Sequence, residues 1–333
     1  MTPITQREPS GSPVVSGAVD DVMAYAVLPW AYSLHTRATR RPHFVIGYLP
    51  GRLSDLNREA LASALEYLSI SHEFSLLSHD ARFIHQGHIS PTTFTKFQLA
   101  DLIPGQHVWI DIDTVATAGW DHIFSEISSA PSGAHLVVAT RGDRPPAQPG
   151  KPSKPSDLVF NAGVLGWPAR NRIPWSGALD SAEIGETQEQ QLFNSLYANH
   201  LWTISERFNT LTYRYDQVDS SQLPLIMHYA GAHKPWHVPR RFSGACLRHQ
   251  CPWSLWFQLE KELLSKLSGY RNLEDVVRLQ SEALRSGALG VSGEQRGRAL
   301  LHALRILGPL GWMAVVLAKP FSRLIPKGTH PLH

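Results

Sequence analysis

Apolar segments of two kinds alternate along the chain and predict the elements of its fold. Short apolar runs, typical of buried strands, occupy residues 43–48, 73–77, 107–112, 134–139 and 158–164. Segments with apolar residues at helical spacing occupy residues 21–33, 54–68, 91–102 and 187–199. Strands that alternate with helices in this way indicate an α/β fold with parallel strands.

The segment 54–68 and the C-terminal third carry the clearest helix signals. Ser54 is of a type that caps helix N-termini, and Pro252 suits a first helical turn. A further helix is predicted over residues 272–285, with Gly287 ending it. The helix at 54–68 has an apolar face made of Ala60, Leu61, Ala64, Leu65 and Leu68. The helix that begins near Pro252 has one made of Trp256, Leu259, Leu263 and Leu267.

Local composition, including the placing of Pro, Gly and Ser, divides the chain into three parts. Residues 1–15 are polar and rich in Pro, Gly and Ser, so a loose N-terminus is expected, with no secretory signal. Residues 16–240 form the main domain, with a proline-rich surface loop at 142–156. Residues 241–333 form a helical C-terminal region, which we expect to serve acceptor binding or membrane association.

The overall composition is that of a globular protein. Hydrophobic residues make up 43% and charged residues 18% of the 333 residues, which excludes a disordered chain and allows a sizeable core. Two cysteines exclude a disulfide scaffold and favour a reducing, cytoplasmic setting. Cys246 and Cys251 flank His249, but without a second cysteine pair we favour free thiols over a zinc site.

The net charge of +3 is unevenly distributed. No acidic residue follows Glu294, whereas six Lys and Arg residues do, so the body is mildly acidic and the tail basic. Residues 306–318 are uncharged but too short to span a membrane, which takes about 20 apolar residues. Residues 299–327 therefore either lie peripherally on an anionic membrane surface, or pack as a core helix or as a homo-oligomer contact.

Two acidic residues close the predicted strand 107–112. In extended chain Asp111 and Asp113, on either side of Ile112, share a face at the carboxyl end of a buried strand. Open α/β sheets bind their ligands at that end. Two carboxylates that meet there repel each other unless a cation joins them, and hard oxygen ligands suit Mg²⁺ or Mn²⁺. The alternative is a loop with two solvated acids.

Three further segments carry polar groups beside apolar runs. After residues 223–227, His228 can complete a metal site, Gly231 allows close backbone approach, and Lys234 can hold a phosphate. The amides of Asn161 and Gln190 are suited to hydrogen-bonding sugar hydroxyls. The alternatives are an ordinary loop histidine at 228 or 233, and a solvated helix face at 189–190.

In their order and spacing over residues 16–240, these motifs resemble the family 8 glycosyltransferases, which include glycogenin and bacterial lipopolysaccharide galactosyltransferases. The matching elements are Asp20-Asp21, Thr92-Thr93-Phe94, Asp111-Ile112-Asp113, Asn161-Ala162-Gly163-Val164, Glu189-Gln190-Gln191 and His228 to Trp236. The last one, His-x-x-Gly-x-x-Lys-Pro-Trp, is long and specific, and the ordered set argues against coincidence.

The resemblance implies a GT-A fold, a Rossmann-like mixed sheet flanked by helices. It also implies a UDP-sugar donor, with galactose or glucose transferred and the anomeric configuration retained. Mn²⁺ or Mg²⁺ would be bound by Asp111, Asp113 and His228. The implied donor- and cofactor-binding positions are Asp20 at the uracil, Asp21, Lys96, Ile112, Asn161 and Ala162, Glu189 and Gln190 at the sugar, and Gly231 and Lys234 at the phosphates, together with the metal ligands.

The resemblance assigns catalysis to Gln190 with Glu189. An amide is a poor nucleophile, so we expect attack on the leaving-group face, with Gln190 orienting the reactants. Three positions depart from the family pattern and bear on the donor sugar. Lys96 stands where many members have Arg, Glu189 replaces Asp, and Gln191 replaces the second acid.

Other classes of function compete with transfer. The altered 189–191 segment is compatible with a non-catalytic UDP-sugar-binding or scaffold protein. Nucleic-acid binding is disfavoured because aromatic residues do not interleave with the basic ones, and a dehydrogenase because no G-x-G-x-x-G follows the first strand. The acceptor could be a saccharide, a lipid-linked saccharide or a small natural product. We expect a cytoplasmic protein, peripheral on the inner face of the membrane if its tail docks there.

Overall fold

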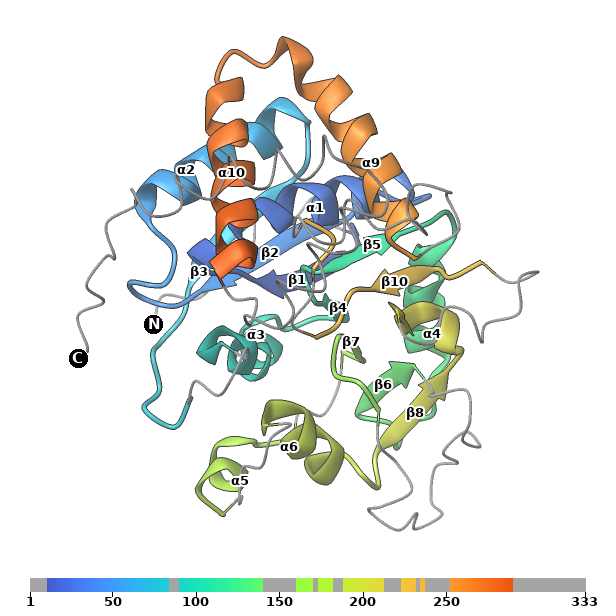
Figure 1. Cartoon of the computed structure of the whole chain (residues 1–333). Coiled ribbons are helices and arrows are strands. Elements are labelled where there is room, and N and C mark those ends of the chain that lie inside the picture. Colours follow the sequence, from blue (N-terminus) through green and yellow to red (C-terminus); the bar gives the residue numbers. More distant parts are fainter. Residues whose placement is uncertain are drawn as a thin grey trace, which may run out of the picture.

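A computed structural model describes residues 11–83, 90–139, 160–169, 173–181, 188–212, 223–231, 234–236 and 252–289 of the chain. Its centre is a seven-stranded sheet in the order β3-β2-β1-β4-β7-β6-β8, drawn in Figure 1. The strands are β1 Val14–Ala18, β2 His43–Tyr48, β3 His72–Leu76, β4 His107–Ile110, β6 Leu136–Ala139, β7 Val164–Trp167 and β8 Leu201–Ile204. All neighbouring pairs are parallel except those of β7, which runs antiparallel to β4 and β6.

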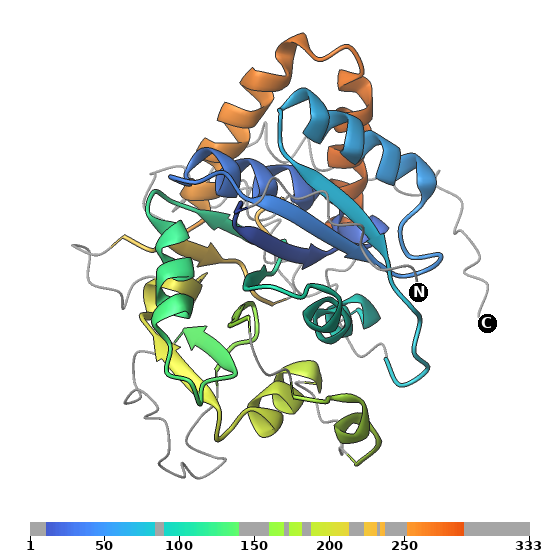
Figure 2. The same cartoon turned by 180° about the vertical axis from the view of Figure 1, so that it is seen from behind.

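Helices cover both faces of this sheet. On one side lie α1 (Val27–Thr36), α2 (Asp55–Tyr67), α9 (Trp253–Lys266) and α10 (Leu273–Leu289). On the other lie α3 (Thr95–Leu102), α5 (Ser176–Ser181) and α6 (Gln188–Leu196), and the view from behind in Figure 2 shows the same layers. A further helix, α4 (Ile123–Ser129), precedes β6. 3-10 turns occupy Asp21–Ala26, Pro91–Phe94, Trp120–His122, Glu206–Asn209 and Leu267–Gly269.

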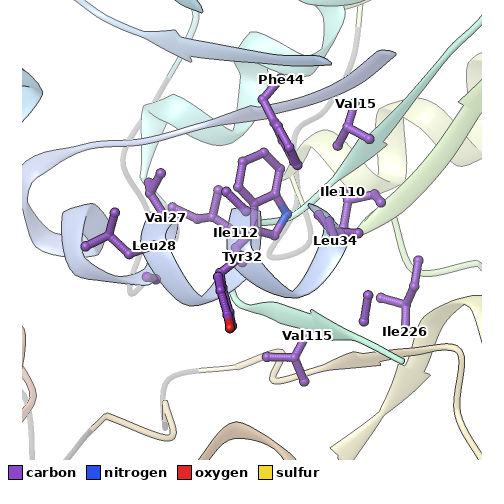
Figure 3. Packing of buried hydrophobic residues seen from close by; sticks show 14 of the residues in the cluster. Val15, Val27, Leu28, Tyr32, Leu34, Phe44, Ile110, Ile112, Val115 and Ile226 are labelled. Carbon is purple, nitrogen blue, oxygen red and sulfur yellow. The ribbon is translucent and has the colours of Figure 1, made fainter. Parts of the chain in front are cut away.

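The sheet has a hydrophobic core on each face because successive strand residues point to opposite sides. In β2, Phe44 and Ile46 join the core under α1, whereas Val45 joins the one under α3. Figure 3 shows the first core, where side chains of the strands meet those of α1. Strands buried on both faces explain why the sequence shows short continuous apolar runs there.

A second, three-stranded sheet lies beside the carboxyl end of β4. It consists of β5 (Thr114–Ala116), β10 (Ile226–His228) and β9 (Thr210–Leu211), with β10 in the middle. β10 runs antiparallel to β5 and pairs His228 with Thr114. This pairing brings the end of β10 next to the residues that follow β4.

Most predicted elements are present, and the expected α/β class is confirmed. The strand at 43–48 has the predicted bounds, and Ser54 caps α2 by accepting a hydrogen bond from the backbone of Asn57. The predicted faces of α2 and α9 point inward, with Leu61 and Trp256 fully buried. Residues 91–102 form a 3-10 turn followed by α3.

Several predicted boundaries are wrong. The strand at 107–112 ends at Ile110, so Asp111 and Asp113 lie in a turn and not in extended chain. The strand predicted at 158–164 begins only at Val164, because residues 161–163 form a turn. α10 continues through Gly287 to Leu289. At the N-terminus, Val14 and Val15 begin β1 within the segment expected to be loose.

β1 escaped prediction because its sequence, VVSGA, is dominated by small residues. The structure accounts for the glycine in it: a Cβ on Gly17 would lie 3.0 Å from the Trp30 ring and 3.2 Å from the Ile110 carbonyl. Cys246, His249, Cys251, the proline-rich loop and the basic tail from residue 290 onward lie outside the described residues. Among the residues that the structure describes, no helix combines the length and apolarity needed to cross a membrane.

Candidate active site

A cavity of about 360 Å³ opens where β1 and β4 end, at the carboxyl edge of the parallel strands. Its walls include the turn after β4, the loop before β7, the start of α6 and the end of β10. Of the residues predicted from the sequence, the cavity is lined by Asp20, Asp111, Ile112, Asp113, Asn161, Glu189, Gln190, His228, Gly231 and Lys234. Segments far apart in sequence therefore converge on one site.

Asp111, Asp113 and His228 form a cluster suited to a metal ion. One ligand atom from each lies within 4.8 Å of the others. His228 Nε2 is 3.3 Å from an Asp113 oxygen and 3.8 Å from an Asp111 oxygen. Two carboxylates and one imidazole suit Mn²⁺, and the oxygen ligands suit Mg²⁺ as well.

The orientation of the His228 ring fits metal binding. Its Nδ1 lies 2.9 Å from Asn209 Oδ1, an acceptor, so Nδ1 carries a proton and Nε2 faces the carboxylates. Metal-binding histidines are commonly oriented in this way by a hydrogen bond from the second ring nitrogen. His228 is 2% exposed, so this orientation is fixed by packing as well.

The backbone holds the two carboxylates in place. Asp111 N–H donates to the Gly163 carbonyl at 2.8 Å, and the Tyr229 N–H donates to the Asp113 carbonyl at 2.9 Å. Trp109 Nε1 donates to the Asp111 carboxylate at 2.6 Å. The acids meet because the turn after β4 is tied to the segments before β7 and after β10.

Lys234 contributes positive charge to this cluster. Its Nζ pairs with Asp113 and donates to the Tyr229 carbonyl at 3.1 Å. Burial opposes ionisation of Asp113, but Lys234 and His228 more than offset it, so the pKa of Asp113 lies well below its ordinary value. Asp113 is therefore ionised at neutral pH and available as a ligand.

Lys96 lies behind the cavity and does not line it. Its Nζ is 3.3 Å from Glu189 and 3.4 Å from Asp111, and it donates to the Ala162 carbonyl at 3.1 Å. Burial lowers the pKa of Lys96, but the carboxylates of Asp111 and Glu189 outweigh it and raise the pKa above 10.5. The buried cation thus joins Asp111 of the candidate metal cluster to Glu189, the predicted sugar-binding acid.

Replacing Lys96 with Met should destabilise the protein strongly, because the Glu189 and Asp111 carboxylates would lose their buried partner. Breaking a buried ion pair from one side costs about 3–5 kcal/mol. Urea unfolding measures this loss directly. Lys261→Met, at an exposed position of α9, is the matched control. A loss below about 1 kcal/mol at position 96, as for surface pairs, would contradict the role assigned to Lys96.

The loop before β7 is held to the start of α6. Gln190 Oε1 accepts hydrogen bonds from Asn161 Nδ2 at 3.2 Å and from the Ala162 N–H at 3.4 Å. Asn194, one turn along α6, accepts from the Phe160 N–H at 2.9 Å and donates to its carbonyl at 3.1 Å. These bonds place Asn161 and Gln190 side by side at the cavity.

The two neighbouring acids Asp20 and Asp21 have separate surroundings. Asp20 lines the cavity and accepts from Ser90 Oγ at 2.7 Å and from the Met23 N–H at 3.2 Å. Asp21 Oδ1 instead accepts from Ser54 N–H at 2.9 Å and Asn57 Nδ2 at 2.8 Å, at the start of α2. Neither Asp21 nor Ala162 is among the lining residues, although both were expected to contact the donor.

The cavity contains residues that the sequence did not indicate. Ser90, Trp109, Ala18, Met23 and Ala230 line it, and Asn209 lies behind His228. Ser90 and Asn209 fall outside the recognised motifs, and single polar residues of this kind give no periodic or spacing signal. Thr92 and Thr93, which do belong to a motif, line the cavity as well.

Several solved structures that share this architecture are glycosyltransferases. The galactosyltransferase LgtC, in complex with donor and acceptor sugar analogs, is 21% identical, with a TM-score of 0.56 over 72% of this chain and 95% of that one. An active-site mutant of LgtC is 19% identical, with a TM-score of 0.58 over 75% and 95%. The apo glycosyltransferase GlyE of Streptococcus pneumoniae is 18% identical, with a TM-score of 0.51 over 77% and 64%.

The fold is that of the GT-A glycosyltransferases. The model of glycosyl transferase family 8 matches residues 19–239, a span that contains every site residue described above except Ala18. The chain belongs to this family. Among curated proteins, no similar sequence is found.

Proposed function

We propose that this glycosyltransferase moves a hexose from a UDP-sugar to a hydroxyl group of an acceptor, with a divalent metal and with retention at the anomeric carbon. One observation carries the proposal: the cluster of Asp111, Asp113 and His228 shares a cavity with Lys234 and Gln190. A metal-binding cluster beside a cation suits a diphosphate, and the amide beside it suits a sugar.

The lining of the cavity suggests how the donor lies. Asp20, at the far side near Ser90, would accept a hydrogen bond from the uracil N–H. The diphosphate would lie against the metal-binding cluster and the neighbouring ammonium of Lys234. Gly231 has a φ of +94° that favours glycine, and its position in the lining leaves room for a phosphate oxygen beside the backbone.

Charge development on UDP is the main demand of the reaction. Mn²⁺ or Mg²⁺, held by Asp111, Asp113 and His228, would supply Lewis-acid stabilisation of the diphosphate as the sugar–phosphate bond breaks. Lys234 adds a second fixed positive charge close to Asp113. Preorganised charges of this kind stabilise the transition state without reorganisation during the reaction.

Retention is best explained by attack on the face that the phosphate leaves. The candidate nucleophiles are engaged: Gln190 Oε1 accepts two hydrogen bonds, and Glu189 pairs with Lys96. In front-face attack, the bond from the anomeric carbon to the phosphate oxygen breaks while the bond to the acceptor oxygen forms. The acceptor proton passes to the departing phosphate oxygen, so the products are UDP and a glycoside.

The transferred hexose is galactose or glucose. Glu189, which lines the cavity and pairs with Lys96 behind it, would face the donor sugar, at positions where many family members have Asp and Arg. Gln190 and Asn161 add amide groups suited to sugar hydroxyls. The acceptor is a saccharide, a lipid-linked saccharide or a small natural product.

A donor panel tests the proposal. UDP release from UDP-galactose, UDP-glucose and their N-acetyl analogues is measured with Mn²⁺, with and without candidate acceptors. We expect turnover with a UDP-hexose and loss of turnover on addition of a chelator. Retention is read from the anomeric proton coupling of the product. UDP binding without turnover across the panel would contradict the proposal and indicate a UDP-sugar-binding protein instead.

A further inference from the structure

A chain of three side-chain amides, those of Asn209, Asn161 and Gln190, runs from His228 along the wall of the cavity. His228 Nδ1 donates to Asn209 Oδ1 at 2.9 Å, and Asn209 Nδ2 donates to Asn161 Oδ1 at 3.0 Å. Asn161 Nδ2 then donates to Gln190 Oε1 at 3.2 Å. The metal-binding cluster and the amide expected at the sugar are thus connected by hydrogen bonds that all point in one direction.

Backbone groups fix the direction of this chain, because each of them can act in only one way. The Asn161 carbonyl can only accept, and it lies 3.2 Å from Asn209 Nδ2. The Gly163 N–H can only donate, and it lies 3.0 Å from Asn161 Oδ1. The Ala162 N–H likewise faces Gln190 Oε1. None of the three amides can be turned over without placing like groups against each other.

This direction has two consequences for the site. Asn209 presents an oxygen to His228, so Nδ1 must hold the proton and Nε2 is the atom turned toward Asp111 and Asp113. At the other end, the oxygen of Gln190 is occupied, so its NH₂ group is the part left to meet the donor. Gln190 therefore acts as a hydrogen-bond donor and not through its oxygen.

Local folding places Asn209 at this position. It ends the 3-10 turn Glu206–Asn209 and immediately precedes β9, which pairs in parallel with β10 so that Leu211 lies opposite His228. Asn209 is 7% exposed and does not line the cavity. It touches the metal-binding cluster only through His228.

We propose that Asn209 is a positioning residue that sets the protonated nitrogen of His228 and, through Asn161, the donor face of Gln190. The proposal deepens the function proposed above and rests on it for the role of Gln190. Partners of this kind behind a metal ligand contribute about 10–100-fold to metal affinity or activity.

Two variants separate the two halves of the chain of amides. Asn209→Leu removes the hydrogen bond with His228 and both hydrogen bonds to Asn161, so the Kd for Mn²⁺ should rise about 10–100-fold. Asn209→Asp still accepts from His228 Nδ1 but cannot donate to Asn161. We expect this variant to bind Mn²⁺ no more weakly than the unaltered chain and yet to lose kcat in UDP release. Asn199→Leu, at an exposed position, is the matched control.

The primary readouts need no UDP-sugar. Mn²⁺ binding is followed by electron paramagnetic resonance with the metal alone. The protonated nitrogen of His228 is identified by ¹⁵N NMR of the metal-free chain, with the signal assigned by its loss in His228→Gln. We expect a proton on Nδ1 in the unaltered chain and in Asn209→Asp, and no such preference in Asn209→Leu.

Two results would overturn the proposal: a bare Nδ1 in the unaltered chain, or a Kd for Mn²⁺ in Asn209→Leu within about twofold of the unaltered value. If Asn209→Leu does not fold, the spectrum of the unaltered chain and the Asn209→Asp variant decide. An unaltered chain with the expected spectrum and Mn²⁺ affinity but no turnover would contradict the proposed function and leave the positioning role of Asn209 intact.

Discussion

Asp113→Asn is expected to reduce UDP release from the UDP-hexose on the order of 10³-fold, because a metal ion contributes several kcal/mol of transition-state stabilisation and each 1.36 kcal/mol is tenfold in rate. The asparagine keeps the volume of Asp113 but removes the charge that faces both His228 and Lys234. Affinity for Mn²⁺ should fall with turnover, since one of two carboxylate ligands is lost. Both are measured on the same preparation.

The control for this variant is Asp55→Asn. Asp55 lies at the start of α2, is 84% exposed at its side chain, and pairs with Arg58 on the surface. Exposed ion pairs contribute about 0–1 kcal/mol to stability, so this variant should keep full activity. Full activity in Asp113→Asn, with Mn²⁺ still required, would refute Asp113 as a metal ligand.

Gly163→Ala should also disable the site, although it adds only a methyl group. A Cβ at this position would overlap Cε1 and Nδ1 of the His228 ring and would lie 2.9 Å from Asn161 Oδ1. The ring or the loop before β7 must therefore shift, which changes the position of His228 relative to Asp111 and Asp113. We expect the Kd for Mn²⁺ to rise and turnover to fall, each by at least about 10–100-fold.

Gly133→Ala is the matched control, because a Cβ there meets nothing within 4 Å. Overpacking of a buried site costs typically about 1–3 kcal/mol, so Gly163→Ala should still fold, as circular dichroism would show. An alanine variant at 163 that binds Mn²⁺ as tightly as the control would contradict the close packing of His228 against the loop before β7.

Much of the fold could be predicted because its strands and helices carry local signals. β2 was readable from its continuous apolar run, since it is buried on both faces, and α2 from its Ser54 cap and apolar stripe. β7 was misjudged because apolar residues before Val164 suggested strand, whereas Asn161 in this stretch bonds to α6 instead. Contacts with another element overrode the local pattern.

The site was only partly predictable. Asp111 and Asp113 were expected to meet by lying in one strand, but the strand ends at Ile110 and a turn brings them together. Asn209 could not be found, because its partners His228 and Asn161 are 19 and 48 residues away in sequence and meet only through the pairing of β9 with β10. Hydrogen bonds between distant segments leave no trace in spacing.

Lys96 illustrates a different limit. From the sequence it was only a departure from the arginine of many relatives that bears on the donor sugar, whereas in the structure its ammonium lies within 3.4 Å of both Asp111 and Glu189. Glu189 is one methylene longer than the aspartate of the family pattern, which compensates for a cation with a single nitrogen at its end. The two departures are thus coupled in space.

Binding of UDP to the unaltered chain, measured by isothermal titration calorimetry with Mn²⁺ and again with a chelator in place of Mn²⁺, tests the central claim most directly. If the cluster of Asp111, Asp113 and His228 holds the metal against the diphosphate, UDP binds at one site with Mn²⁺ and at least about tenfold more weakly without it. Equal affinity in the two titrations, or no binding in either, would contradict the assignment of this cavity as a metal-dependent UDP-sugar site.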